Sequence, residues 1–150
     1  MINVERRFVV DRPMRETVDY LADFAHAVDW DPGTRSCTRI GDGPLTEGAR
    51  WHNTSEFRGR TTQLVYRLAR LTEDRLVFRG TNKTADSTDD LTFRPLGSDG
   101  AATEVTYRAT IRFKGFAALA TPFLRGEFER LGDDIVTRLP HAVEAAVPRA

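Results

Sequence analysis

The residues of this chain that could move a proton are one aspartate and two tyrosines on apolar faces of predicted strands. Two-residue alternation places Asp89 in line with Leu91 and Phe93. Tyr66 and Tyr107 fall among apolar residues of their own strands in the same way. A carboxyl or phenol group in such a position can act as a general acid or base when its pKa is shifted. Asp89, Tyr66 and Tyr107 are therefore the candidates for a catalytic role, although no nucleophile motif accompanies them.

The environment of Asp89 decides whether it can have that role. Inside a cavity, loss of solvation would raise the pKa of its carboxyl group. At the frayed start of a strand, beside Asp90 and the polar segment 83–87, the carboxyl would lie in solvent and keep a pKa near ~3.9. The polar neighbours favour the exposed position.

The other reactive residue types form no recognisable site. His26, His52 and His141 lie far apart and show no metal-ligand spacing, so we expect surface histidines and no metal site. Cys37 has no signature of an activated thiol, and we expect it to be half-buried in a strand. The turn at residues 41–43 precedes a strand and not a helix, so it lacks the amide cluster of a phosphate-binding loop. No cofactor is expected.

Hydrophobic periodicity indicates the elements that must position these residues. A first strand is expected near residues 3–10, followed by two short helical pieces that end at the break Asp31-Pro32-Gly33. Short turns rich in glycine separate the segments after this break, and such connections favour antiparallel neighbours. Further strands are expected at residues 34–40, 49–57, 61–71, 76–80, about 89–95 and 103–113.

The last predicted element is an amphipathic helix from about Phe116 to Leu139. Apolar residues recur there at spacings of three and four, and we expect Phe123 and Phe128 to face the sheet. Proline is tolerated in the first turn of a helix but costs ~3 kcal/mol in its interior. The continuous helix should therefore begin near Pro122 and should kink or end at Pro140.

This order of elements predicts an α+β fold. We expect a curved antiparallel sheet of about seven strands wrapped around the long C-terminal helix, with two short helices after the first strand. At 150 residues the chain has the size of one domain, so residues 1–150 should form a single unit with one core. A sheet that curves around a helix can enclose a cavity.

Composition argues against two kinds of partner. The 22 basic and 22 acidic residues balance to a net charge of zero, so the electrostatic footprint of a nucleic-acid binder is missing. No apolar run approaches the ~20 residues of a membrane span, and no signal peptide is recognisable. A single cysteine fits a reducing compartment. We therefore expect a cytoplasmic location, no nucleic-acid partner and no membrane span.

Several short motifs together give the chain a family resemblance. They are the opening strand with Asp11-Arg12-Pro13, the stretch Tyr20-Leu21-Ala22-Asp23-Phe24, the break Trp30-Asp31-Pro32-Gly33, the turn Glu47-Gly48-Ala49-Arg50-Trp51, the strand Asp90-Leu91-Thr92-Phe93-Arg94-Pro95 and the segment Thr103-Glu104-Val105-Thr106-Tyr107. In this order the sequence resembles the polyketide cyclase/dehydrase branch of the START-like (SRPBCC, Bet v 1-type) superfamily over essentially its whole length. The resemblance implies a helix-grip fold with a deep hydrophobic cavity between the sheet and the C-terminal helix. It does not specify a function, since members include lipid carriers, aromatase/cyclases and plant ligand binders.

Strand parity and the helix face assign a lining to that cavity. A dry core avoids polar groups without partners, because each costs roughly 1–3 kcal/mol, yet several polar side chains fall on apolar-facing positions. A hydrated or ligand-filled cavity would relieve this cost. The predicted ligand-binding residues are Trp51, Asn53, Ser55, Leu64, Tyr66, Phe78, Leu91, Tyr107, Ala109, Phe123 and Phe128.

These assignments have simpler alternatives. Asn53 and Ser55 can lie near a strand end and reach solvent, and the two tyrosines can bond backbone groups at the edge of the core. Trp30 and Trp51 can form a wall of the pocket, or they can pack the short helices on the sheet.

Two functions from different classes fit this sequence. The first is binding or carriage of a small hydrophobic molecule such as a lipid, a polyketide or an aromatic metabolite. The second is a polyketide cyclase, aromatase or dehydratase that acts in the same cavity. Binding is favoured, because the predicted concave face offers one carboxylate and no histidine. A role through a protein partner and assembly into a homodimer are further possibilities.

Overall fold

The chain folds into one antiparallel sheet with a long C-terminal helix packed on it. The computed structural model describes residues 1–149. Two short helices follow the first strand, as expected, with a 3₁₀ turn between them, and the α+β helix-grip class is confirmed. The elements are β1 (Ile2–Val10), α1 (Met14–Ala22), η1 (Phe24–His26), α2 (Ala27–Trp30), β2 (Thr34–Ile40), β3 (Arg50–Phe57), β4 (Arg60–Thr72), β5 (Arg75–Thr81), β6 (Ala85–Leu96), β7 (Ala102–Phe113), η2 (Gly115–Ala120) and α3 (Thr121–Ala146).

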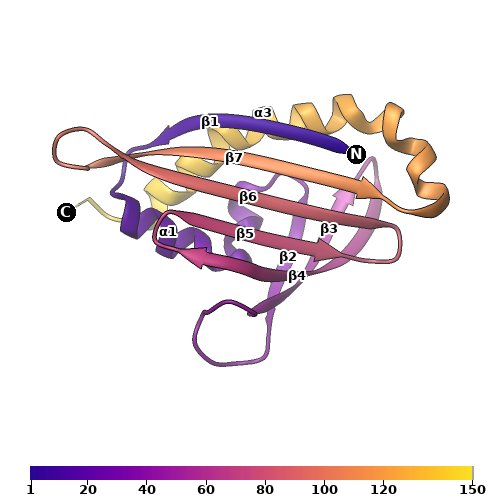
Figure 1. The fold of residues 1–150 in the computed structure, drawn as a ribbon, viewed down its shortest axis with the longest axis horizontal. Coiled ribbons are helices and arrows are strands. Elements are labelled where there is room, and N and C mark those ends of the chain that lie inside the picture. Colours follow the sequence, from indigo (N-terminus) through magenta and orange to yellow (C-terminus); the bar gives the residue numbers. More distant parts are fainter. Residues whose placement is uncertain (150) are drawn as a thin grey trace.

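The seven strands have the order β1-β7-β6-β5-β4-β3-β2. Every neighbouring pair is antiparallel, and only the β1–β7 pair joins strands that are distant in sequence. The sheet curves strongly, so that β2 and β3 run steeply across the direction of β6 and β7 (Figure 1). Register shifts in β2, between Thr34 and Ser36, and in β4, between Leu68 and Arg70, lie in the curved half. Such shifts bend a strand and increase its twist.

Most strand boundaries agree with the sequence prediction to within one residue, but β6 is longer than expected. It begins at Ala85, whereas the prediction began it at about residue 89. Ser87 pairs with Gly80 on one side and with Ile111 on the other, so this polar segment lies inside the sheet. The inward face of this part of β6 is polar, so the sequence there lacks the apolar alternation that predicts the other strands.

Helix α3 begins with Pro122 in its first turn, as predicted, but it does not end at Pro140. It continues to Ala146, because residues on both sides of the proline are anchored in the core. Leu139 and Val143 are fully buried. The Arg12 side chain donates to the carbonyl oxygens of Glu144 and Val147, at 2.8 and 2.6 Å, and so satisfies acceptors at the end of the helix.

The face of α3 that contacts β1 includes a glycine. A Cβ atom at Gly132 would lie 2.6 Å from Cγ1 of Val4, so only glycine permits this approach of helix and strand. Beside it, Arg6 pairs with Glu129 and Asp133 of the helix, at 3.0 and 2.9 Å. Figure 1 shows α3 running along β1 on one side of the sheet.

The prediction that Phe123 faces the sheet is wrong. Its side chain is 75% exposed, and Phe116 and Leu119 are also exposed. Residues 115–120 form a separate 3₁₀ turn before α3, so their periodicity differs from that of an α-helix. Almost every residue from 116 to 124 is apolar, so the sequence could not indicate which side turns inward.

The packed core fills the half of the molecule that lies away from η2. Phe24 is its centre, with ring centroids 4.5 Å from those of both Tyr66 and Phe78. Trp30 and Trp51 are buried against it at 5.9 and 6.1 Å. Within residues 1–149, no helix has the length and apolarity needed to cross a membrane.

Candidate functional site

A cavity of about 480 Å³ lies between the sheet and α3. The strands β3, β4, β6 and β7 form one wall, and η2 and α3 form the other. Its lining residues are Val4, Asp31, Gly33, Ser55, Glu56, Phe57, Arg60, Thr62, Leu64, Tyr66, Asn82, Thr84, Ala85, Ser87, Asp89, Tyr107, Ala109, Ile111, Phe113, Ala117, Ala120, Leu124, Phe128, Leu131, Gly132 and Ile135.

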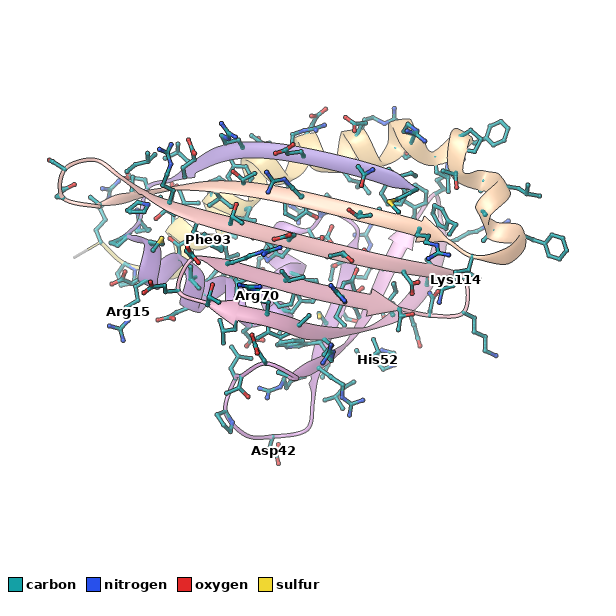
Figure 2. All side chains as sticks on the ribbon, in the orientation of Figure 1. Arg15, Asp42, His52, Arg70, Phe93 and Lys114 are labelled. Atoms are coloured by element: carbon teal, nitrogen blue, oxygen red, sulfur yellow. The ribbon has the colours of Figure 1, made fainter. Side chains whose placement is uncertain are left out.

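Strand register shows how deep the cavity extends. Along β6 the inward residues at 85, 87 and 89 line it, whereas Leu91 and Phe93 are buried in the packed core. Along β7 the lining runs from Phe113 inward to Tyr107. The cavity therefore occupies the half of the sheet near Lys114 and ends before Phe93, and these two residues lie in opposite halves of the molecule in Figure 2. We call the end at Asp89 and Tyr107 the closed end.

The opposite end is the mouth of the cavity, formed by turns. It lies between the β3–β4 turn, the β5–β6 turn and η2, where Arg60 and Thr84 are exposed. Between the mouth and the closed end, most of the wall is apolar. Leu64, Ile111 and Ile135 are among the buried residues there.

Asp89 and Tyr107 form a buried pair at the closed end. The Tyr107 hydroxyl donates a hydrogen bond of 2.5 Å to Oδ1 of Asp89, and both side chains are buried. Burial raises the pKa of Asp89 to about 7, which the Tyr107 hydrogen bond opposes and the negative charge of Asp31 reinforces. The expectation of a solvent-exposed Asp89 is therefore wrong. Because β6 begins four residues earlier than predicted, Asp89 lies inside the strand and not at its start.

Tyr66 extends the polar closed end across the sheet. Its ring lies over Gly80, its cross-strand partner, where a Cβ atom would come within 2.6 Å of the ring. Burial raises the pKa of the Tyr66 and Tyr107 hydroxyls well above the usual value, and the charge of Asp89 adds to the effect. Both phenols therefore remain protonated at neutral pH; the Tyr107 proton is donated to Asp89, whereas the Tyr66 hydroxyl can donate into the cavity.

A chain of hydrogen bonds connects four side chains beside this group. The Ser55 hydroxyl donates to Oδ1 of Asn53 at 2.6 Å, and Nδ2 of Asn53 donates to the Thr34 hydroxyl at 3.1 Å. Thr34 in turn donates to Oδ2 of Asp31 at 2.8 Å. Asn53 is buried, so the alternative in which it reaches solvent at a strand end is wrong. Burial raises the pKa of Asp31, and the hydrogen bonds from Gly33 and Thr34 oppose this rise.

The predicted ligand-binding residues separate into three groups. Ser55, Leu64, Tyr66, Tyr107, Ala109 and Phe128 line the cavity, as does Asp89. Trp51, Asn53, Phe78 and Leu91 are buried beyond the lining, in the packed core. Phe123 points to solvent.

The alternative of plain packing describes both tryptophans better than a pocket wall. Neither residue is part of the cavity lining. Trp51 donates from Nε1 to Oδ1 of Asp23 at 3.0 Å, which fastens the segment after α1 to the sheet. Trp30 packs against Phe24 and Tyr107, so it supports the closed end from behind.

Sequence reasoning missed Asp31 as a lining residue. It stands in the turn after α2, and its inward position depends on how that helix docks against β2. The signal was its place in Trp30-Asp31-Pro32-Gly33, where a carboxylate can accept bonds from the next residues. It does so here, from the Gly33 amide and the Thr34 hydroxyl.

The other candidate residues lie outside the cavity. Burial raises the pKa of the half-buried Cys37 to about 11, so its thiol is not activated. His26 stacks on Tyr20 with ring centroids 4.1 Å apart, and is half-buried where an exposed position was expected. His52 points away from the sheet into solvent (Figure 2), and His141 is exposed. In residues 1–149, no group of three or more histidine, cysteine or acidic side chains is placed to hold a metal ion.

Comparison with known proteins gives a family and a set of similar folds. Residues 1–144 match the family described as polyketide cyclase/dehydrase and lipid transport. No curated protein matches the sequence.

Solved structures resemble the chain over nearly its full length. The protein TTHA0849 from Thermus thermophilus has 14% identity and a TM-score of 0.79, with 97% of this chain and 99% of that chain covered. A START superfamily protein from Mycobacterium smegmatis has 13% identity and a TM-score of 0.78, at the same coverage. The Zhui aromatase/cyclase from Streptomyces sp. R1128 has 15% identity and a TM-score of 0.76, with 97% and 95% covered. At these identities the similarity is evidence for the fold alone.

Proposed function

The chain belongs to the polyketide cyclase/dehydrase and lipid transport family, and we propose that it binds or carries a small hydrophobic molecule such as a lipid, a polyketide or an aromatic metabolite. The observation that supports this proposal is the cavity between the sheet and α3. Its volume of about 480 Å³ falls within the ~300–1,000 Å³ of small-molecule sites.

The composition of the cavity suits a ligand with a long apolar part. The walls between the mouth and the closed end are lined mainly by aliphatic and aromatic side chains, such as Leu64, Ile111, Leu124 and Phe128. Each Å² of apolar ligand surface removed from water contributes ~25 cal/mol. The polar groups at the closed end would then orient the ligand, as a few placed polar groups do in other pockets.

A cavity-blocking variant tests the proposal. Ala109 lines the middle of the cavity from β7, so Ala109→Trp should fill the space without displacing a packed core. The neutral fluorescent probe N-phenyl-1-naphthylamine should bind the unmodified protein and should lose most of its affinity for Ala109→Trp. Arg108→Trp is the matched control, because Arg108 is exposed on the outer face of the same strand. Equal probe binding by all three proteins would argue against this cavity as the binding site.

The second candidate function is catalysis by a cyclase, aromatase or dehydratase, and the Asp89–Tyr107 pair favours it. A carboxyl group with a pKa of about 7 can accept a proton from a carbon next to a carbonyl group at neutral pH. The phenol of Tyr66 would donate a hydrogen bond to the oxygen on which negative charge develops, while Tyr107 holds the Asp89 carboxylate in place. Ring closure or loss of water would then follow from the folded conformation in which the cavity holds the substrate.

Proton exchange can separate this candidate from simple binding. An aryl methyl ketone that binds in the cavity would exchange its methyl protons for deuterium in D₂O if Asp89 removes them, and NMR can follow the exchange. Asp89→Asn should abolish the accelerated exchange and still bind the ketone. A ketone that binds without accelerated exchange would leave binding or carriage as the function.

A further inference from the structure

The charged groups of the cavity are distributed unevenly along its depth. Glu56 and Arg60 belong to the mouth, where both are exposed. Asp89 lies at the closed end, and the half-buried Asp31 lines the cavity from the turn after α2. Among the lining residues of the described chain, Arg60 is the only basic one, so the cavity inside its mouth holds two carboxyl groups and no cation.

Both carboxyl groups line the cavity and lie close enough for their charges to interact. The charge of Asp31 raises the pKa of Asp89, and it also acts on both tyrosine hydroxyls. Arg35 and Arg138 lower the pKa of Asp31, but their side chains are exposed and neither residue lines the cavity. The closed end is therefore an acidic site whose nearest cations lie outside it.

The closed end also has hydrogen-bond acceptors that no donor of the described chain occupies. Within residues 1–149, Tyr107 supplies the hydrogen bond to Oδ1 of Asp89, and no group donates to Oδ2. The hydroxyls of Ser55 and Tyr66 also line the cavity and can accept as well as donate. An ammonium group has three donors and no acceptor, which matches this arrangement.

We propose that the cavity selects hydrophobic amines, bound with the protonated nitrogen at Asp89 and Asp31 and the apolar part toward the mouth. This inference rests on the proposed binding function and assigns its ligand class. A carboxylate ligand, such as a fatty acid, would bury a negative charge beside two acidic groups and without a cation, which is costly. A neutral alcohol would find hydrogen bonds but no charge to pair.

Two opposing effects determine the strength of this selection. The ammonium group loses its hydration on entering the cavity, and a buried ion pair forms only when good hydrogen bonds compensate that loss. The Asp89 carboxyl group has already lost its hydration in the folded protein, as its burial and its raised pKa indicate. Burial disfavours the ionised form of Asp89, and the positive charge of a bound amine should stabilise that form.

Three ligands of equal chain length test the inference. Decylamine, decanol and decanoate, each below its micellar concentration, are titrated into the protein at neutral pH by calorimetry. We expect decylamine to bind at least about tenfold more tightly than decanol, since hydrogen bonds to charged groups are the strong ones. Decanoate should bind more weakly than either.

The variant Asp89→Asn removes the charge and keeps the shape of the side chain. It should lower the affinity for decylamine by about tenfold and leave the affinity for decanol nearly unchanged. Asp86→Asn is the matched control on the same strand, because Asp86 pairs with Lys114 and does not line the cavity. It should leave all three affinities unchanged.

A second measurement does not depend on the folding of a variant. In the unmodified protein, bound decylamine should lower the pKa of the Asp89 carboxyl from its value of about 7 in the ligand-free protein. Carbon-13 NMR measures this pKa. An unchanged pKa on saturation, or decanoate that binds as tightly as decylamine, would overturn the inference and leave the proposed function in place. If decylamine, decanol and N-phenyl-1-naphthylamine all fail to bind, both the inference and the proposed function fail.

Discussion

The Tyr107 hydroxyl and the Asp89 carboxyl lie 2.5 Å apart at the closed end of the cavity, on neighbouring strands. Their residues are not direct cross-strand partners, since Asp89 pairs with Ala109 and Leu91 pairs with Tyr107. The tyrosine therefore reaches diagonally toward the small Ala109 to meet the carboxyl, which places both groups at the boundary between cavity and core.

Removing this hydrogen bond should raise the pKa of Asp89 further. The Tyr107 hydroxyl stabilises the ionised carboxylate, and it is the contribution that lowers the pKa against the effect of burial. In Tyr107→Phe we therefore expect a pKa clearly above the value of about 7 in the unmodified protein. Carbon-13 NMR of the aspartate carboxyl groups measures it. An unchanged or lower pKa would mean that the hydrogen bond does not form in solution.

The raised pKa of Asp89 also predicts how stability depends on pH. In the unfolded chain the carboxyl ionises near its ordinary pKa of 3.8, whereas in the folded protein it stays protonated up to about pH 7. Between these values the folded state binds the extra proton, so Asp89 lowers the free energy of unfolding as pH rises, and the loss is complete above about pH 7.

Asp89→Asn isolates this contribution. The difference in free energy of unfolding between the variant and the unmodified protein should shift in favour of the variant as pH rises from about 4 to about 7, by a few kcal/mol at most. Urea denaturation at a series of pH values measures it. A difference that stays constant over this range would show that Asp89 has an ordinary pKa.

The sequence predicted the strands well and the cavity lining only in part. Alternation located most strands to within one residue, because one face of each strand is apolar and the other is polar. The start of β6 was missed because Ser87 and Asp89 face the polar end of the cavity, where inward residues are not apolar. Asp31 was missed for a different reason: its turn motif indicates hydrogen bonds to the next residues, but the docking of α2 decides that it points inward.

The two phenylalanines assigned to the inner face of the last helix should respond differently to substitution. Phe123 is 75% exposed, so Phe123→Ser should change the free energy of unfolding by less than ~0.5 kcal/mol. Phe128 is half-buried and stacks on Phe57 at 4.9 Å, so Phe128→Ala should cost about half of the ~3–5 kcal/mol of a fully buried phenylalanine. Chemical denaturation of both variants measures the contrast. Equal losses would mean that the first turns of α3 dock differently.

Two glycines of α3 provide a matched test of how closely the helix approaches β1. Replacing an exposed glycine inside a helix by alanine stabilises it by ~1 kcal/mol, because alanine restricts the unfolded chain and favours the helix. Gly126 is exposed, and a Cβ atom there would have the Arg130 side chain as its nearest neighbour, at 3.8 Å. Gly126→Ala should therefore raise the free energy of unfolding.

Gly132→Ala should lower the free energy of unfolding by ~1–3 kcal/mol, although the change in intrinsic helix preference is the same as in Gly126→Ala. The added methyl group would lie 2.6 Å from Cγ1 of Val4, a buried and β-branched side chain that cannot turn aside without leaving its rotamer. The helix must then move away from β1, which also weakens the ion pairs of Arg6 with Glu129 and Asp133. Thermal and urea denaturation of the two variants measure the difference in sign. If both substitutions stabilise the protein, α3 does not lie against β1 as closely as described, and the cavity between helix and sheet is wider.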